Sequence, residues 1–264
     1  MKFSLQILLG SLLILATLAS CRKEENADEF SIASQDMAIS ADLMQDIEDQ
    51  SNNQLSEIGV RGCAVLTTSQ PKGIFPNTVT IDFGNGCTGP DGRSRIGKMI
   101  INVTDSLKLV GSIRIITLEN YSVNGIKIEG TVTVTNQGKN SDGEVNFTRI
   151  VNGAKLTFED GTSRTWSANQ TITYKAGFDT KELIDDVFSI TGNAIGIARD
   201  GSDIAYEIIQ PLIKSSDCKW IESGTAKLTR KLINATIDFG GGTCDRNATI
   251  TGPNGKVSSI LLRP

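Results

Sequence analysis

The chain has 264 residues, with 26 Lys and Arg against 30 Asp and Glu and no histidine. The net charge of −4 argues against a nucleic-acid partner, which requires clustered basic surface. Without histidine there is no Ser-His-Asp or Cys-His mechanism and no zinc site built on imidazole. We therefore expect no cofactor, no metal and no catalytic residue.

Residues 1–20 are typical of a lipoprotein signal peptide. Lys2 precedes an apolar run from Leu5 to Leu18, which is short for a transmembrane helix and right for the hydrophobic region of a signal peptide. The Leu-Ala-Ser-Cys sequence that ends at Cys21 resembles the lipobox of bacterial lipoproteins. The resemblance implies that Cys21 becomes the first mature residue and carries acyl chains such as palmitate. The alternative is an ordinary signal peptide with a chance cysteine.

Residues 21–33 are expected to form an acidic tether behind the lipidated cysteine. Lys23, Glu24 and Glu25 are similar to the surface-export signal of Bacteroidota lipoproteins. That similarity implies an outer-membrane location facing the cell exterior, with the lipid anchor as the contact to the membrane. The alternative is a charged spacer on the periplasmic face.

Residues 34–58 have the spacing of an amphipathic helix. Apolar residues recur at helical intervals, and acids lie between them. The stripe consists of Met37, Ile39, Ala41, Leu43, Met44 and Ile47. We expect this helix to cover one end or face of a sheet, since its acids would be repelled by anionic lipid.

Residues 59–264 are expected to form a single β-rich domain. Asn-Gly and Asp-Gly pairs, which tolerate the positive φ of tight hairpin turns, begin at positions 85, 91, 124, 142, 152, 160, 200 and 254. Apolar and polar residues alternate cleanly from Ile126 to Val134, and less cleanly from Ile113 to Tyr121. About a dozen or more short strands predict a mainly β fold, an antiparallel meander that forms a sandwich or an open barrel-like sheet.

Besides Cys21 the chain has four cysteines: Cys63, Cys87, Cys218 and Cys244. An even count in an oxidising compartment predicts disulfides, and no CxxC spacing suggests a metal. A hairpin that turns at Pro71–Pro76 brings Cys63 opposite Cys87. A second hairpin, whose first strand opens at Cys218 and whose turn is at Thr229–Leu232, brings Cys218 opposite Cys244. We expect these two pairs, each closing the open end of a hairpin; cross-pairing between the two regions is the alternative.

The two hairpins share a phrase. TIDFGNGC, from Thr80, returns as TIDFGGGTC, from Thr236, and each copy is followed by a Gly-Pro-Asp/Asn-Gly-Arg/Lys turn. The second copy has an extra stretch, Asp245–Thr251, before that turn. The intervening chain has no matching partner, so the pattern indicates one duplicated corner within a single domain. The residues expected to face the core are Val79, Ile81 and Phe83, and Ala235, Ile237 and Phe239.

Four stretches carry a wider resemblance: TIDFGNGCTGPDGRSRIGK, YSVNGIKIEGTVTVTN, CKWIESGTAKL and TIDFGGGTCDRNATIT. They are similar to a family of Bacteroidota outer-membrane lipoproteins of unknown activity, over most of the mature chain. The resemblance implies lipidation, export and a β-rich body. It carries over no catalytic residue.

Several groups of residues allow a chemical as well as a structural interpretation. Two carboxylates about 5–9 Å apart would suit a glycosidase, but duplication predicts that Asp82 and Asp238 instead bond backbone amides near the following glycines. Asp200–Asp203 and Asn140–Glu144 lack the loop of an EF-hand and are expected to be hairpin turns. Core or interface packing, rather than a sugar-stacking platform, is expected of the larger aromatic residues: Tyr121, Trp166, Tyr174, Tyr206 and Trp220.

Ser106 is a candidate modification site, because Asp105-Ser106-Leu107 resembles the short O-glycosylation site of Bacteroidota proteins. For the whole chain we expect a surface-exposed outer-membrane lipoprotein without catalytic activity. It would be a binding or structural module for a glycan, an apolar ligand or a surface protein. The alternative is a glycan hydrolase that uses only carboxylates. Two carboxylates with perturbed pKa in one pocket would favour the hydrolase, and a broad uncharged apolar cavity would favour a hydrophobic ligand.

Overall fold

The computed structural model describes residues 32–52, 63–180, 182–231 and 233–262. In this part of the chain a helix over residues 32–52 precedes 14 strands, which confirms the expected mainly β fold. The signal peptide, Cys21 and most of the tether lie outside the described residues, as do residues 53–58 of the predicted helix. Within the described residues, no helix is long and apolar enough to cross a membrane.

The strands form one antiparallel sheet. They are β1 (Val65–Thr68), β2 (Asn77–Asp82), β3 (Cys87–Thr88), β4 (Ser94–Val103), β5 (Ile113–Val123), β6 (Ile126–Lys139), β7 (Val145–Thr157), β8 (Ser163–Ala176), β9 (Val187–Ile197), β10 (Asp203–Ser215), β11 (Ser223–Arg230), β12 (Ile233–Gly241), β13 (Asn247–Thr251) and β14 (Val257–Leu261). Their order in the sheet follows the chain from β1 to β14, except that β4 pairs with β2 and the short β3 pairs with β4 alone. The sheet is therefore a meander, and it is not closed.

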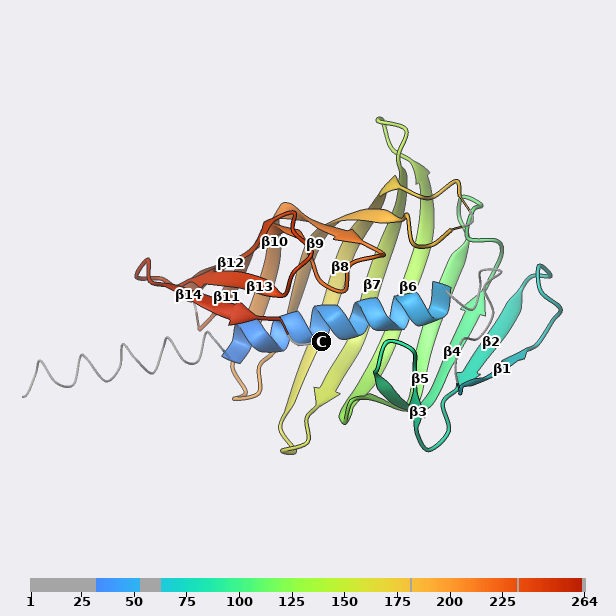
Figure 1. The fold of residues 1–264 in the computed structure, drawn as a ribbon, viewed down its shortest axis with the longest axis horizontal. Coiled ribbons are helices and arrows are strands. Elements are labelled where there is room, and N and C mark those ends of the chain that lie inside the picture. Colours follow the sequence, from blue (N-terminus) through green and yellow to red (C-terminus); the bar gives the residue numbers. More distant parts are fainter. Residues whose placement is uncertain (1–31, 53–62, 181, 232, 263–264) are drawn as a thin grey trace, which may run out of the picture.

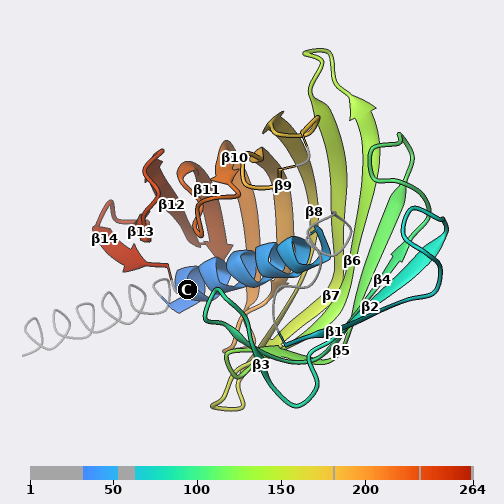
Figure 2. The same cartoon turned by 45° about the vertical axis from the view of Figure 1, so that its right-hand side comes forward.

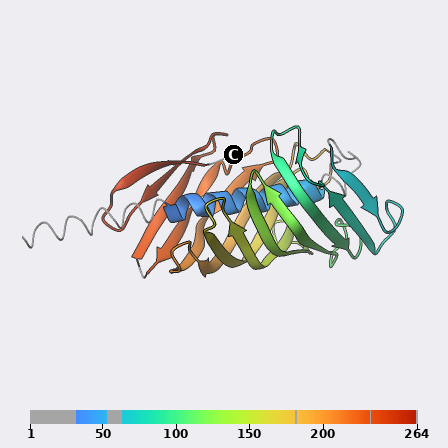
Figure 3. The same ribbon diagram turned by 90° about the horizontal axis from the view of Figure 1, so that it is seen from below.

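The sheet curls around the helix. Figure 1 shows the helix, in blue, lying across the long central strands, and Figure 2 shows the strands bending round it. Seen from below in Figure 3, the helix occupies the trough of the curved sheet. Of the two predicted forms, the open barrel-like sheet is the one observed, and its concave face is filled by the helix.

The predicted apolar stripe of the helix provides part of the core. Ile39, Leu43 and Ile47 are buried against the sheet, with exposed fractions of 6%, 4% and 0%. They follow one another at intervals of four residues, so they lie on one side of the helix. Ala41, also assigned to the stripe, is exposed because it lies on the side that faces away from the sheet. The helix thus covers one face of the sheet, as predicted.

Most Asn-Gly and Asp-Gly pairs lie where hairpin turns were predicted. Asn124 (φ 48°) and Gly125 (φ 81°) form the two-residue connection between β5 and β6. There are two exceptions. The pair at 85 lies between β2 and β3, which do not pair with each other, and the pair at 152 lies inside β7, where the register with β8 shifts between Val151 and Ala154. Positive φ serves a β-bulge as well as a turn, so this dipeptide alone does not distinguish the two.

A second bulge explains why alternation is poor in β5. The register between β4 and β5 shifts between Ile96 and Lys98, opposite Asn120, which has a φ of 48°. Arg114, before the shift, and Tyr121, after it, are both buried, although strict alternation would place them on opposite faces of the sheet. An extra residue in one strand reverses the faces of all the residues that follow it.

The duplicated phrase forms strands β2 and β12, as predicted. All six residues expected to face the core are buried, with exposed fractions of 5% or less. The strands stop short of the cysteines, however. β2 ends at Asp82, because the chain turns at Gly84 and Gly86, both of which have positive φ. The expectation that a strand opens at Cys218 is wrong: the Cys218 amide donates to the carbonyl of Ser215 in a loop, and β11 begins only at Ser223.

Candidate binding site beneath the helix

The inner face of the curved sheet carries arginines. Arg95, Arg114 and Arg149 belong to β4, β5 and β7, and each is at most 5% exposed. Arg93 and Arg199 lie in the turns next to β4 and β9. A guanidinium that is removed from water requires acceptors or an opposite charge, since burying it alone costs several kcal/mol or more.

Acidic side chains of the helix supply that charge to most of these arginines. An amphipathic helix normally turns its charged face to water, but here Asp36, Asp46 and Glu48 are buried. The ion pairs are Asp36–Arg199 at 2.5 Å, Asp42–Arg93 at 2.8 Å, Glu48–Arg149 at 2.7 Å, and Asp46–Arg95, in which Nε donates to Oδ2 at 3.1 Å. The helix is therefore held in the trough by charge as well as by its apolar stripe.

Arg114 is the exception among the buried arginines of these strands. It is 3% exposed, and no carboxylate of the described chain bridges it. Its Nη1 donates a hydrogen bond to Oδ1 of Asn52, and its Nε has no acceptor among the described residues. Its cross-strand neighbours are Val103 and Val134. Burial lowers the pKa of Arg114, and the nearby charge of Glu48 opposes this only in part.

Arg114 lies in the wall of a cavity of about 280 Å³ between the second half of the helix and the sheet. Glu48 and Asn52 of the helix face the same cavity. Much of the remaining wall is aromatic, with neighbouring ring centroids 4.8–6.1 Å apart. The rings are those of Phe147, Tyr174, Phe178 and Phe188. The cavity thus combines an apolar wall with one buried cation.

The acids of this cavity do not form a matched catalytic pair. Burial raises the pKa of Asp186 to about 6, with a smaller contribution from Asp185. Glu48 is engaged by Arg149. A paired-acid hydrolase needs two carboxyls that face each other and whose environments separate their pKa values. The wall also contains Glu182, and no described contact brings two of these three carboxyls together. Arg114 means that the cavity is not uncharged either.

A smaller cavity of about 90 Å³ lies beside the first half of the helix. Arg164 and Trp166 face it, with the guanidinium carbon 5.3 Å from the ring centroid. Burial lowers the pKa of Arg164 to about 10. Its volume is about a third of that of the cavity beside Arg114.

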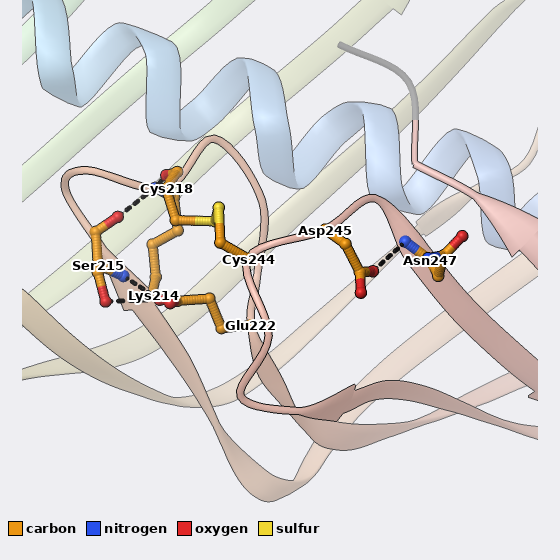
Figure 4. The surroundings of a disulfide bond; sticks show 7 residues. All are labelled: Lys214, Ser215, Cys218, Glu222, Cys244, Asp245 and Asn247. Atoms are coloured by element: carbon orange, nitrogen blue, oxygen red, sulfur yellow. Dashed lines mark hydrogen bonds between the residues drawn. A yellow bond between two sulfur atoms is a disulfide. The ribbon is translucent and has the colours of Figure 1, made fainter.

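Both predicted disulfides are present. Cys63 bonds to Cys87 with Cα atoms 5.5 Å apart, and Cys218 bonds to Cys244 with Cα atoms 5.6 Å apart. Figure 4 shows the second bridge in front of the helix, next to Lys214. The Lys214 ammonium donates hydrogen bonds to the carbonyl oxygens of Cys218 and, at 2.7 Å, of Ser215. Each bridge closes the open end of its hairpin, as predicted.

Ser106 lies in the turn after β4 and contributes to the wall of the larger cavity. It is half-buried, and its amide donates to Asp105 Oδ1 at 2.7 Å. Its glycosylation stays a prediction.

Asp82 and Asp238 have the structural role that duplication predicts. The Gly84 amide donates to Asp82 Oδ1 at 2.9 Å, and the Gly240 amide donates to Asp238 Oδ1 at 2.8 Å. Their strands, β2 and β12, lie near opposite ends of the sheet order (Figure 1). They therefore do not form a glycosidase pair.

The remaining candidates are also structural. Asp200 Oδ1 accepts the Ser202 amide at 3.1 Å, and Asn140 Oδ1 accepts the Asp142 amide at 3.0 Å, as in ordinary turns. In the described part of the chain, no three His, Cys, Asp or Glu side chains are placed to hold a metal. The predicted core packing of the aromatic residues is confirmed, since all five are buried or packed against the core: Tyr121, Trp166, Tyr174, Tyr206 and Trp220.

Arg114 was not predicted from the sequence. The available signal was a lone arginine in the apolar run Ile113 to Ile116. The face of the sheet on which Arg114 lies was ambiguous, because the bulge at Asn120 interrupts the alternation of buried and exposed residues along β5.

No protein-family model, curated protein or solved structure matches the chain.

Proposed function

We propose that the protein is an outer-membrane lipoprotein, anchored through Cys21 and facing the cell exterior, whose folded body binds an apolar ligand without catalysing a reaction. The observation that supports binding is the cavity of about 280 Å³ walled by Phe147, Tyr174, Phe178 and Phe188. Ligand sites are typically concave and mostly apolar, with a few polar groups that fix orientation.

The helix forms part of this site rather than a detachable cover. Its ion pairs with Arg95 and Arg149 lie in the protein interior, where removal of either partner leaves an uncompensated charge. A binding experiment therefore needs the soluble chain from residue 22 onward, including the helix.

A cavity-filling substitution tests the binding proposal. Val134 is buried in the cavity wall, so Val134→Phe should occupy part of the space and weaken binding of a neutral probe, decanol, by about tenfold or more. The matched control is Thr133→Phe, which adds the same ring at the next position of β6, on the other face of the sheet. Decanol binding is measured by calorimetry. Failure of the unsubstituted chain to bind, or equal loss in both variants, would contradict the proposal.

The anchor is tested separately. Cys21→Ser should release the protein from the membrane fraction, because loss of the lipid chains removes most of its membrane affinity. Fractionation after a high-salt wash measures this. A variant that still pellets with membranes would show that Cys21 is not the anchor.

The outward orientation depends on the residues that follow. Replacing Lys23, Glu24 and Glu25 with Ala should turn a protease-accessible protein into a protected one in intact cells, without loss of lipidation. Unchanged accessibility would mean that these residues serve only as a tether.

A further inference from the structure

We propose that the ligand of the larger cavity carries a carboxylate head that pairs with Arg114, and an apolar body that lies against the aromatic wall. This inference rests on the proposed binding function and adds the chemical class of the ligand. It starts from Arg114, a buried strand arginine that receives an amide from the helix where Arg95 and Arg149 receive an acid. Arg164 of β8 also has no carboxylate among the described ion pairs, but it faces the smaller cavity.

Two neighbouring arginines of the trough receive an acidic partner from the helix. Arg149, two strands from Arg114 in the sheet order, receives Glu48 at 2.7 Å, and Arg95, on the next strand, receives Asp46. At the corresponding place opposite Arg114 stands Asn52, which has no charge. A ligand carboxylate would give Arg114 the partner that Asp and Glu give the others.

The surroundings of Arg114 offer few hydrogen-bond acceptors to its guanidinium. Its cross-strand neighbours, Val103 and Val134, offer no acceptor, and both lie in the cavity wall. The Nε atom lacks an acceptor among the described residues. A guanidinium binds a carboxylate through two parallel N–H···O bonds, and such charge-assisted bonds are about twice as strong as neutral ones. The cavity next to Arg114 provides space for such a carboxylate.

The other charged groups of the cavity wall disfavour a ligand with two negative charges. Glu48, Glu182 and Asp186 face the cavity together with one further cation, the exposed Lys108, and Glu48 is already paired with Arg149. The excess of acids would repel a dianion such as a phosphate monoester more strongly than a monoanion. A monocarboxylate brings one charge, which Arg114 can balance. On the apolar side, Phe147, Tyr174 and Phe178 form a continuous aromatic cluster. The ligand class is therefore a monocarboxylate with a hydrocarbon body.

The test compares decanoate with decanol, which share a chain length and differ in the head group. Isothermal titration at pH 7.5 with the soluble chain from residue 22 should show decanoate binding about tenfold or more tightly than decanol. Arg114→Gln should remove this preference and leave decanol affinity within about twofold. Retained preference in that variant would overturn the assignment of Arg114.

A second variant keeps the fold and blocks the head-group site. Asn52→Asp has nearly the same shape and places a carboxylate where Arg114 already donates to Oδ1. It should raise the melting temperature and lower decanoate affinity to the level of decanol. Ser106→Asp is the control, because it adds the same charge to the cavity wall outside the helix. It should weaken decanoate binding less than Asn52→Asp does; an equal loss would indicate general repulsion and would overturn a direct pairing.

The outcomes also separate this inference from the function on which it rests. Equal binding of decanoate and decanol by the unsubstituted chain would overturn the carboxylate head and leave the apolar binding site in place. Binding of neither probe would overturn the binding function itself.

Discussion

The turn that follows the first copy of the repeated phrase, Gly89 to Arg93, closes with the same hydrogen bonds as the turn that follows the second, Gly252 to Lys256. In each, the first glycine donates its amide to the carbonyl of the last residue at 2.9 Å. In each, the side chain of the middle residue, Asp91 or Asn254, accepts the amide two residues on, at 3.1 and 3.0 Å. Duplication has therefore preserved the backbone of this corner.

The strand pairing around the two turns differs. In the first copy β4 follows the turn and pairs directly with the phrase strand β2. In the second copy the extra residues after Cys244 form β13 (Asn247–Thr251), which lies between the phrase strand β12 and β14. A short insertion has thus added one strand to the edge of the sheet without disturbing the disulfide or the turn.

The side chains of the two turns differ as well. In the first copy Arg95 bonds both Asp91 of the turn, at 2.5 Å, and Asp46 of the helix. The equivalent position in the second copy is Ser258, which is exposed. One copy of the corner therefore holds the helix, whereas the other forms an edge. A repeated sequence predicts a repeated backbone, and the charged side chains decide what each copy does.

Removal of the helix-holding side chain should give the largest difference between the copies. Arg95→Met leaves the buried Asp46 with Arg93, 3.7 Å away, as its remaining partner among the described ion pairs. Loss of the closer partner of a buried pair costs up to about 3–5 kcal/mol in the free energy of unfolding. Ser258→Met, at the equivalent exposed position, should change it by about 0.5 kcal/mol or less. Urea unfolding followed by circular dichroism compares them. Similar values for the two variants would mean that the Arg95–Asp46 pair does not hold the helix.

The disulfides should behave alike in the two copies, because their backbones do. They join residues 24 and 26 positions apart, and the entropy of loop closure depends only weakly on length. Replacing either pair by Ala should lower the free energy of unfolding by about 2–5 kcal/mol and leave the other bridge intact. Unfolding curves with non-reducing peptide mapping test this. A much smaller loss in one copy, or a bridge between Cys63 and Cys218, would break the equivalence.

The features that sequence predicts here are local ones. Short-range geometry, which the repeated phrase makes visible, is enough to predict the pairing of Cys63 with Cys87, the glycine turns and the inward direction of Ile81 and Phe83. The partners of the helix acids do not follow from such patterns. Asp46 meets Arg95 only because the sheet curls around the helix, and that curvature results from bulges that a single sequence does not reveal.

The helix acids also predict how stability depends on pH. Burial raises the pKa of Asp49 to about 6, against the opposing effects of the hydrogen bond that Gln45 donates to it and of the charge of Lys214. The pKa of Asp186 is also raised to about 6, first by burial. Between the unfolded value of about 4 and the folded value of about 6, the folded chain binds protons that the unfolded chain releases. Stability from these groups is therefore lost as pH rises through this window.

We expect the free energy of unfolding to be about 1–2 kcal/mol higher at pH 5 than at pH 7.5 for the two carboxyls together, allowing for solvent screening at Asp186. Asp49→Asn combined with Asp186→Asn should flatten the profile, as measured by urea unfolding at each pH. Asp91, whose pKa is lowered, serves as the contrast: Asp91→Asn should lower stability equally at pH 5 and pH 7.5, and its effect should shrink only as pH falls below about 4. A profile that rises from pH 5 to pH 7.5 would contradict the environments of Asp49 and Asp186.

The smallest expected effect concerns the aspartates of the repeated phrase. Asp82→Asn and Asp238→Asn retain the oxygen that accepts the glycine amide, so Asp238→Asn should be nearly neutral. Asp82 also pairs with Lys98 at 2.9 Å on the surface, a contact with no counterpart among the described ion pairs of Asp238. Asp82→Asn should therefore be slightly destabilising at low salt, and the difference between the two variants should vanish at high salt, because exposed ion pairs are screened. Asp→Ala at either site removes the amide acceptor as well and should cost more than Asn in both copies. Melting temperatures of the four variants at two salt concentrations measure these effects. If Asp238→Asn lowered the melting temperature as much as Asp238→Ala, the duplication would preserve the charge of this residue rather than the turn hydrogen bond.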